Sequence, residues 1–186
     1  MDLNQAIRSR RAVREFRDTP IARTVLETLI DAAIQAPSAM NEQPWTFTVV
    51  QDRAILGQAS QQAKAYALQS AALDLPPSLR DRLARPDFDL FYRAPVLIVI
   101  SSVSANRWAV ENCSLAAENL MLCACAQGLG SCWIGLAQPW FATATGKRTL
   151  RLPAAGVPVA PIIVGEPAGS PSPVPRKPPR IEWIGP

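Results

Sequence analysis

A helix that is apolar on nearly every side is the feature that most constrains how this chain can fold. Residues 112–127 contain no Pro or Gly and are rich in Ala, Leu and Met, which are strong helix formers. Because the apolar side chains are not confined to one stripe, we expect a buried central helix, covered by its own chain or also by a second subunit. Gly128 or Gly130 supplies the left-handed residue that ends a helix, and residues 131–136 then read as a short buried strand.

The rest of the chain alternates helices with strands. Strands are predicted at residues 45–50, 96–100 and 158–165, and helices at residues 2–9, from Thr19-Pro20 to residue 34, at 52–70 and at 139–145. With no repeat and no linker, this order predicts an α+β fold with a central mixed β-sheet flanked by helices, in a single domain spanning 1–186. Prolines recur from residue 166, so residues 166–186 are expected to form an extended C-terminal arm.

The composition excludes several classes of chemistry. The chain contains no histidine, which rules out Ser-His-Asp and Cys-His mechanisms, His-ligated zinc and His general bases. If the protein is an enzyme, a cofactor is therefore expected to carry the reaction. The four cysteines lack the spacing of a metal knuckle or an iron–sulfur site, so we expect reduced thiols, no metal and a cytoplasmic protein.

Basic residues form two clusters, one near each end of the sequence. Five arginines lie between residues 8 and 17, and three basic residues lie between residues 176 and 180. The clusters are either solvated termini or two halves of one anion-binding site, and contact with nucleic acid is the third alternative. No nucleic-acid recognition motif is visible, so we expect no nucleic acid partner. The central helix is too short, and too interrupted by Glu and Asn residues, to span a bilayer, so we expect no membrane partner.

A polar loop lies between two prolines, Pro37 and Pro44. It carries Ser38, Asn41 and Gln43 on a backbone that cannot continue the preceding helix. From the residues alone, the loop is either an ordinary helix-to-strand connection or part of a binding site.

Four segments in order resemble the FMN-dependent nitroreductase family. They are residues 10–16 (RRAVREF), 36–47 (APSAMNEQPWTF), 117–120 with 128–135 (AENL and GLGSCWIG), and 175–179 (PRKPP). The resemblance runs from about residue 3 to the end of the chain. It implies an intertwined homodimer with FMN at the subunit interface, and it favours the second interpretation of the proline loop.

The resemblance also implies the cofactor-binding residues, position by position. Arg10 and Arg176 would contact the phosphate, with Lys177 as an alternative to Arg176, and Arg14 would contact the ring edge or ribityl chain. The 37–43 loop would come from the other subunit, and residues 132–135 would run along the isoalloxazine. The full set is Arg10, Arg11, Ala12, Arg14, Pro37, Ser38, Ala39, Asn41, Gln43, Cys132, Trp133, Ile134, Gly135 and Arg176.

The chain departs from the family pattern at three places. Ala12 stands where Ser is common, the acidic residue often found near Gly135 is absent, and residues 61–89 match nothing in the pattern. Lys64 is a candidate ribityl or ring contact within that unmatched region.

These implications lead to a predicted reaction. Hydride passes from NAD(P)H to the flavin and then to a small oxidised acceptor, a nitroaromatic or a quinone, in a ping-pong mechanism with no catalytic side chain. The alternative is a flavin-binding or flavin-modifying protein of the same fold that does not turn over such acceptors.

Overall fold

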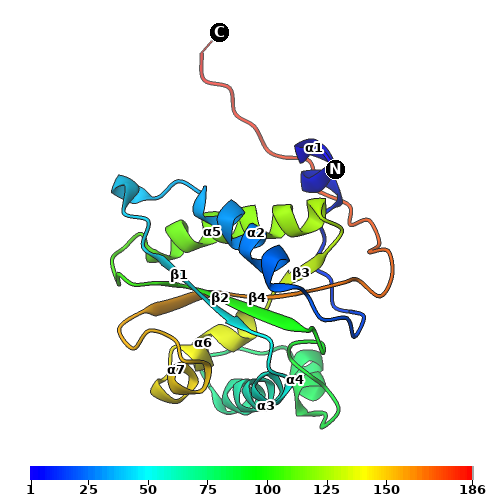
Figure 1. The fold of residues 1–186 in the computed structure, drawn as a ribbon, viewed down its shortest axis with the longest axis vertical. Coiled ribbons are helices and arrows are strands. Elements are labelled where there is room, and N and C mark those ends of the chain that lie inside the picture. The colour runs from blue at the N-terminus through cyan, green and yellow to red at the C-terminus, as the bar shows by residue number, and fades with distance from the viewer. Residues whose placement is uncertain (186) are drawn as a thin grey trace.

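The computed structural model describes residues 1–185, and its centre is a four-stranded sheet (Figure 1). The strands are β1 (Trp45–Val50), β2 (Val96–Ser102), β3 (Gly130–Trp133) and β4 (Val157–Gly165), in the order β1-β2-β4-β3. The two central strands, β2 and β4, are buried along almost their whole length. Their sequences are continuous apolar runs, as is typical of strands covered on both faces.

Helices cover both faces of the sheet (Figure 1). One face carries α2 (Arg23–Ile34) and α5 (Ala109–Ala126), with α1 (Leu3–Ser9) packed against α5. The other face carries α3 (Arg53–Gln69), α4 (Pro77–Ala84), α6 (Gln138–Phe141) and α7 (Ala144–Leu150). Two short 3-10 turns, at Ala39–Asn41 and Gly135–Ala137, complete the list of helical elements within residues 1–185.

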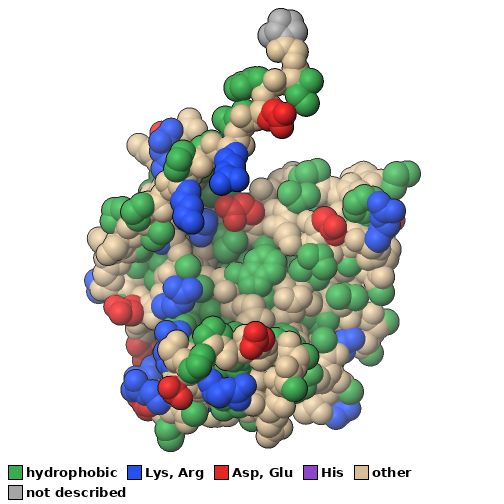
Figure 2. Space-filling model, turned by 180° about the vertical axis from the view of Figure 1, so that it is seen from behind, with side chains coloured by type: hydrophobic (Ala, Val, Ile, Leu, Met, Phe, Trp, Pro, Cys, Tyr) green, Lys and Arg blue, Asp and Glu red, His purple; other side chains and the backbone are tan. Residues whose placement is uncertain are grey.

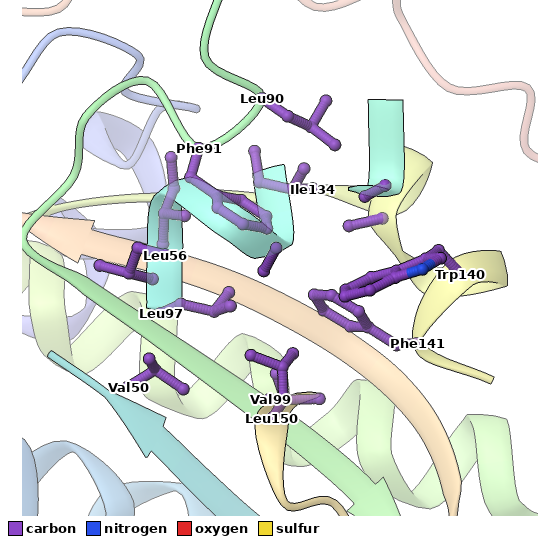
Figure 3. Packing of buried hydrophobic residues seen from close by; sticks show 14 of the residues in the cluster. Val50, Leu56, Leu90, Phe91, Leu97, Val99, Ile134, Trp140, Phe141 and Leu150 are labelled. Carbon is purple, nitrogen blue, oxygen red and sulfur yellow. The ribbon is translucent and has the colours of Figure 1, made fainter. Parts of the chain in front are cut away.

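The sheet separates two apolar cores. Figure 3 shows the core on the α3 side, where Leu97 and Val99 of β2 meet Leu56, Phe91 and Phe141. The other core packs β2 and β4 against α2 and α5. Two cores form because β2 and β4 have apolar side chains on both faces, and each face is covered by helices.

The α+β class is confirmed, but the predicted mixed sheet is antiparallel in all of its strand pairings among the described residues. The parallel contact that the structure does contain is an isolated bridge between Ala12 and Ser131. A prediction from periodicity alone contains no information on strand direction.

Most of the predicted elements are present, and several of their boundaries differ. The helix expected from Thr19-Pro20 begins at Arg23, because residues up to Ala22 remain extended. The strand expected at residues 131–136 ends at Trp133, where the chain turns into a 3-10 helix. The single helix expected at residues 139–145 is two helices, α6 and α7. Helix α4 lies in a region for which no element was predicted. Asp2 and Asp52 cap α1 and α3 through their side chains, as expected of Asp before a helix.

The central helix α5 is buried on the sides that face the sheet, α1 and α2. Leu115 and Val110 on the same helix are 45% and 54% exposed. Helix α5 is therefore covered only in part within one chain. Among the described residues, none of the helices has the length and apolarity needed to cross a membrane.

The predicted C-terminal arm is described as far as residue 185, and Pro186 lies outside the described residues. Beyond β4 the chain forms no helix or strand up to residue 185 and projects away from the body (Figure 1). The arm begins beside the N-terminal segment, since Arg17 N donates to Glu166 O at 2.9 Å and Ala168 N donates to Glu15 O at 3.0 Å.

Candidate functional site

A cavity of about 470 Å³ lies where the N-terminal segment, β3 and α4 meet. Its size is within the range of about 300–1,000 Å³ that is usual for small-molecule sites. The lining combines two arginines with apolar and aromatic side chains and contains no carboxylate. The lining residues are Arg14, Leu79, Arg82, Leu90, Tyr92, Cys132, Trp133, Ile134, Gly135 and Leu136.

Pairing with β3 positions the first arginine cluster. Val13 N donates to Ser131 O at 3.0 Å, and Ala12 forms a bridge with Ser131. A Cβ on Gly130 would lie 2.8 Å from Val13 Cβ, so the close approach of the two backbones requires glycine there. This pairing brings Arg14 to the cavity, beside residues 132–135 as the sequence predicted.

The neighbouring arginines have different environments. Arg10 forms an ion pair with Glu118 of α5 at 3.4 Å, and only 22% of its side chain is exposed. Arg11 instead donates to the backbone carbonyls of Arg8 and Arg10, both at 2.7 Å, and its Nε is buried with no partner in the described structure. Arg11 therefore fixes the N-terminal segment and also lines a second hollow, of about 360 Å³, between that segment and the C-terminal arm.

Cys132 lines the cavity and has a shifted thiol pKa. Burial raises the pKa of its thiol, and the positive charges of Arg14 and Arg10 partly oppose that shift. The thiol is therefore neutral near pH 7. Arg14 also lines the cavity, where its positive charge favours an anionic ligand.

Two residues that the sequence did not identify cover the cavity from the α4 side. Arg82 Nη2 donates to the Tyr92 hydroxyl at 2.7 Å, and the Arg14 guanidinium lies 5.9 Å from the Tyr92 ring centroid. Tyr92 and Arg93 both have left-handed backbones, with φ of 53° and 55°. Non-glycine residues seldom adopt this conformation, which here directs Tyr92 to the cavity between the buried Phe91 and Ala94.

The proline loop does not reach this cavity within the same chain. Ala39 N donates to Asn112 Oδ1 at 2.9 Å, which fixes the loop to the N-terminal end of α5, whereas Ser9 Oγ lies 3.5 Å from Cys125 Sγ near the other end. At 1.5 Å per residue, these two points on α5 are about 20 Å apart. Figure 1 also shows the loop and α1 at opposite ends of α5.

The loop itself has a defined conformation. Gln43 N donates to Ser38 Oγ, and Gln43 Nε2 donates to Asn41 Oδ1. Met40, Asn41 and Gln43 have positive φ angles of 53°, 54° and 47°. Such a strained backbone is costly and is typical of loops that act in binding.

The other sequence-predicted positions lie outside the cavity. Arg176 is exposed on the C-terminal arm and lines none of the cavities described here. Lys64 is 5% exposed and donates to the carbonyls of Arg85 and Phe88, so it fixes the chain after α4 and does not contact a ligand in this cavity. All four cysteines are free, and within residues 1–185 no group of three or more His, Cys, Asp or Glu residues could hold a metal ion.

Comparisons with known proteins show the family to which the chain is similar. Residues 7–166 match the model of the nitroreductase family. A putative NADH dehydrogenase/NAD(P)H nitroreductase of Methanothermobacter thermautotrophicus is 29% identical over 92% of this chain and 80% of that protein. The 4-nitrobenzoate reductase of Pseudomonas putida is 30% identical over 70% of this chain and 71% of that protein. The 5,6-dimethylbenzimidazole synthase of Rhodospirillum rubrum is 30% identical over 85% of this chain and 78% of that protein.

Solved structures share the fold. A nitroreductase with bound FMN from Desulfitobacterium hafniense has a TM-score of 0.85 at 22% identity, covering 100% of both chains. A second nitroreductase with bound FMN, from Bacteroides fragilis, has a TM-score of 0.82 at 24% identity and covers 100% of this chain and 98% of that one. Because the family model covers most of the sequence and these structures match its whole length, the chain belongs to the nitroreductase family.

Proposed function

We propose that this protein is an FMN-dependent oxidoreductase that passes hydride from NAD(P)H to a small oxidised acceptor. The observation that carries the proposal is the cavity at which Arg14 meets residues 132–135. A flavin has a flat apolar ring and an anionic phosphate, and the cavity offers apolar walls, unpaired cations and no carboxylate. Relatives named as NAD(P)H nitroreductases, and structures named as FMN-bound nitroreductases, support the same assignment.

Arg14 and residues 132–135 line the cavity, which supports the roles that the resemblance implies for them. Arg14 would stabilise negative charge on a reduced flavin, because a cation placed where negative charge develops favours that charge. The backbone from Cys132 to Gly135 would lie along the ring, and Arg10 and Arg176 would hold the phosphate. Bound FMN supplies a hydride acceptor and donor at its N5 atom, so a chain without histidine needs no protein acid or base.

We propose that the functional unit is a homodimer. Helices α1 and α5 expose large apolar side chains, which are Leu3 (66%), Ile7 (54%), Val110 (54%) and Leu115 (45%). Exposed apolar side chains gathered on packed helices are typical of a protein–protein interface. A second copy would also bring its Pro37–Gln43 loop to the cavity that the first copy's loop does not reach.

The overall reaction balances without a further reactant. With a nitroaromatic acceptor, one NAD(P)H and one proton convert the nitro group to a nitroso group, releasing NAD(P)⁺ and water. With a quinone, the same two electrons and two protons give the hydroquinone. If donor and acceptor occupy one cavity in turn, double-reciprocal plots of initial rate will be parallel, as expected for a ping-pong mechanism. Intersecting lines would contradict the shared cavity.

The first experiment is an absorbance spectrum of the purified protein, repeated without oxygen after adding NADH or NADPH. We expect flavin bands that bleach when the reduced nicotinamide is added. Flavin bands that persist would indicate binding without reduction. Absence of flavin even after adding FMN would contradict the proposal, and would show that Ala12 and the altered 61–89 region do not support the site.

The second candidate function is a flavin-binding or flavin-modifying protein of the same fold. The similarity to a protein named 5,6-dimethylbenzimidazole synthase supports this alternative, since that name is not that of a nitroreductase. Sustained NAD(P)H oxidation with a nitroaromatic or quinone distinguishes the two functions. A single turnover without further oxidation would favour the alternative.

Three further predictions accompany this proposal. We propose a cytoplasmic protein, in keeping with the four free cysteines in the described chain. We also propose a single domain across the sequence. The proposed partners are a second subunit and a small-molecule acceptor, and we expect neither a nucleic acid nor a membrane as a partner.

A further inference from the structure

The cavity contains one cation more than the proposed cofactor chemistry uses. Arg14 is assigned to the flavin, whereas Arg82 comes from α4, in the region that matches no family signature. Within residues 1–185, Arg82 forms no ion pair with a carboxylate. A guanidinium has five N–H donors, and within residues 1–185 the Arg82 guanidinium forms one hydrogen bond, to Tyr92.

The Arg82 side chain is nevertheless held in place. Its Nη2 donates to the Tyr92 hydroxyl at 2.7 Å, and its guanidinium carbon lies 4.9 Å from the Phe88 ring centroid. Helix α4 is itself anchored by Leu83, which is fully buried. Arg82 is therefore positioned before any ligand arrives, and its remaining donors are available to an acceptor group.

The surroundings of Arg82 are suited to an aromatic ring. Leu79 lies one helical turn before Arg82 and lines the same cavity, together with Leu90, Trp133 and Leu136. Figure 2 shows most of the Lys and Arg side chains of one face on its left side, beside an apolar middle. Apolar walls with a few placed polar groups are typical of sites that orient a small molecule.

We propose that Arg82 selects an aromatic acceptor that carries an anionic group, such as a carboxylate, and binds that group while the ring lies against the apolar wall. This inference rests on the proposed reductase function, and it makes Arg82 a determinant of specificity. An arginine fork matches the geometry of a carboxylate and remains charged at every cellular pH.

The test compares 4-nitrobenzoate with the neutral 4-nitrobenzamide in wild type and Arg82→Gln. Ring electronics differ between the two acceptors, so the informative quantity is the change in the ratio of their kcat/KM values. We expect Arg82→Gln to lower kcat/KM for nitrobenzoate about tenfold and to leave that for nitrobenzamide within about twofold. A tenfold change corresponds to the lower end of the range for a hydrogen bond to a charged group, and we expect the lower end because Arg82 is exposed. Arg82→Lys should restore part of the loss.

Arg80→Gln is the matched control. Arg80 lies on the same helix and carries the same charge, but it donates to Leu68 O and does not line the cavity. Its removal should leave the ratio unchanged, which separates a contact from a general change in charge. Thermal unfolding of each variant verifies that α4 is intact.

Binding of benzoate, which cannot be reduced, gives a readout besides activity. Calorimetric titration should show an about tenfold weaker Kd in Arg82→Gln and no change in Arg80→Gln. An equal fall for both nitro acceptors, or an unchanged benzoate Kd, would overturn the assignment of Arg82. If wild type reduced neither acceptor, the proposed function would fail, while the benzoate titration would still decide the role of Arg82.

Discussion

At the scale of single residues, three arginines of the N-terminal segment have different contacts. Arg10 pairs with Glu118, Arg11 donates to backbone carbonyls, and Arg14 lines the cavity. The pairing of residues 12 and 13 with Ser131 places Arg14, and not its neighbours, at the cavity.

Arg14→Gln should weaken FMN binding about 10- to 100-fold, because a hydrogen bond or ion pair to a charged group contributes about 1.5–3 kcal/mol. Fluorescence titration of the flavin-free protein with FMN measures the change. Arg148→Gln is the control, since Arg148 contacts only Thr145 among side chains of the described chain. Equal FMN affinity in Arg14→Gln and wild type would remove Arg14 from the cofactor site.

Cys113 is expected to make stability fall at alkaline pH. Burial raises the pKa of its thiol from 9.0 to about 11. Because the folded-state pKa exceeds the unfolded value, the contribution is complete below about pH 9 and is lost as pH rises toward 11. The loss amounts to about 1–3 kcal/mol, at 1.36 kcal/mol per pKa unit.

Urea unfolding of wild type and Cys113→Ala at about pH 8 and about pH 10.5 tests this linkage. Other titrating groups are common to both proteins, so the free energy of unfolding should fall more steeply with pH in wild type. Identical alkaline slopes would contradict a buried neutral thiol at this position.

At the scale of elements, the site depends on close contact between the N-terminal segment and β3. Gly130→Ala would place a methyl group 2.8 Å from Val13 Cβ and should destabilise the protein by about 1–3 kcal/mol. Its FMN affinity should fall as well, because Arg14 would move with the segment. Thermal unfolding and FMN titration measure both effects.

Gly57→Ala, unlike Gly130→Ala, is expected to raise the free energy of unfolding. Gly57 lies inside α3, and no atom lies within 4 Å of the position of an added Cβ. Replacing glycine by alanine inside a helix stabilises by about 0.5–1 kcal/mol. A Gly130→Ala variant as stable as Gly57→Ala would show that the contact with β3 is not tight.

The elements differ in how far the sequence predicts them. Asp2 and Asp52 specify their helices through local caps, and the apolar runs of β2 and β4 specify buried strands. Helix α4 was not predicted, since its sequence is polar and only Leu83 is buried. The same region supplies Arg82, so this part of the site depends on tertiary packing that no local pattern contains.

At the scale of the whole molecule, the candidate site is divided between distant parts of the sequence. The family motifs identified residues 10–14 and 132–135, which the fold brings together. The resemblance implied that the 37–43 loop comes from the other subunit, and within one chain this loop lies about 20 Å away along α5. In the proposed homodimer, a second copy would complete the predicted set of residues.

Leu115→Asp should convert the proposed homodimer to a monomer and reduce FMN affinity. Burying a carboxylate in an apolar interface is costly, and a two-fold symmetric interface would contain it twice. Light scattering combined with size-exclusion chromatography gives the mass. Tyr66→Asp, on α3 at the opposite side of the sheet, is the control. A monomeric wild type that binds FMN fully would contradict the dimer.

The order in which the chain is made gives one consequence of the contacts around residues 10–17. These residues pair with Ser131 and with residues 166–168, and β4 must be present before β3 has a neighbour. At about 5–20 residues per second of synthesis, residues 166–168 are made about 8–30 s after the first arginines. The cavity therefore forms only after β4 and residues 166–168 have been synthesised, and we expect no cofactor to bind before that point.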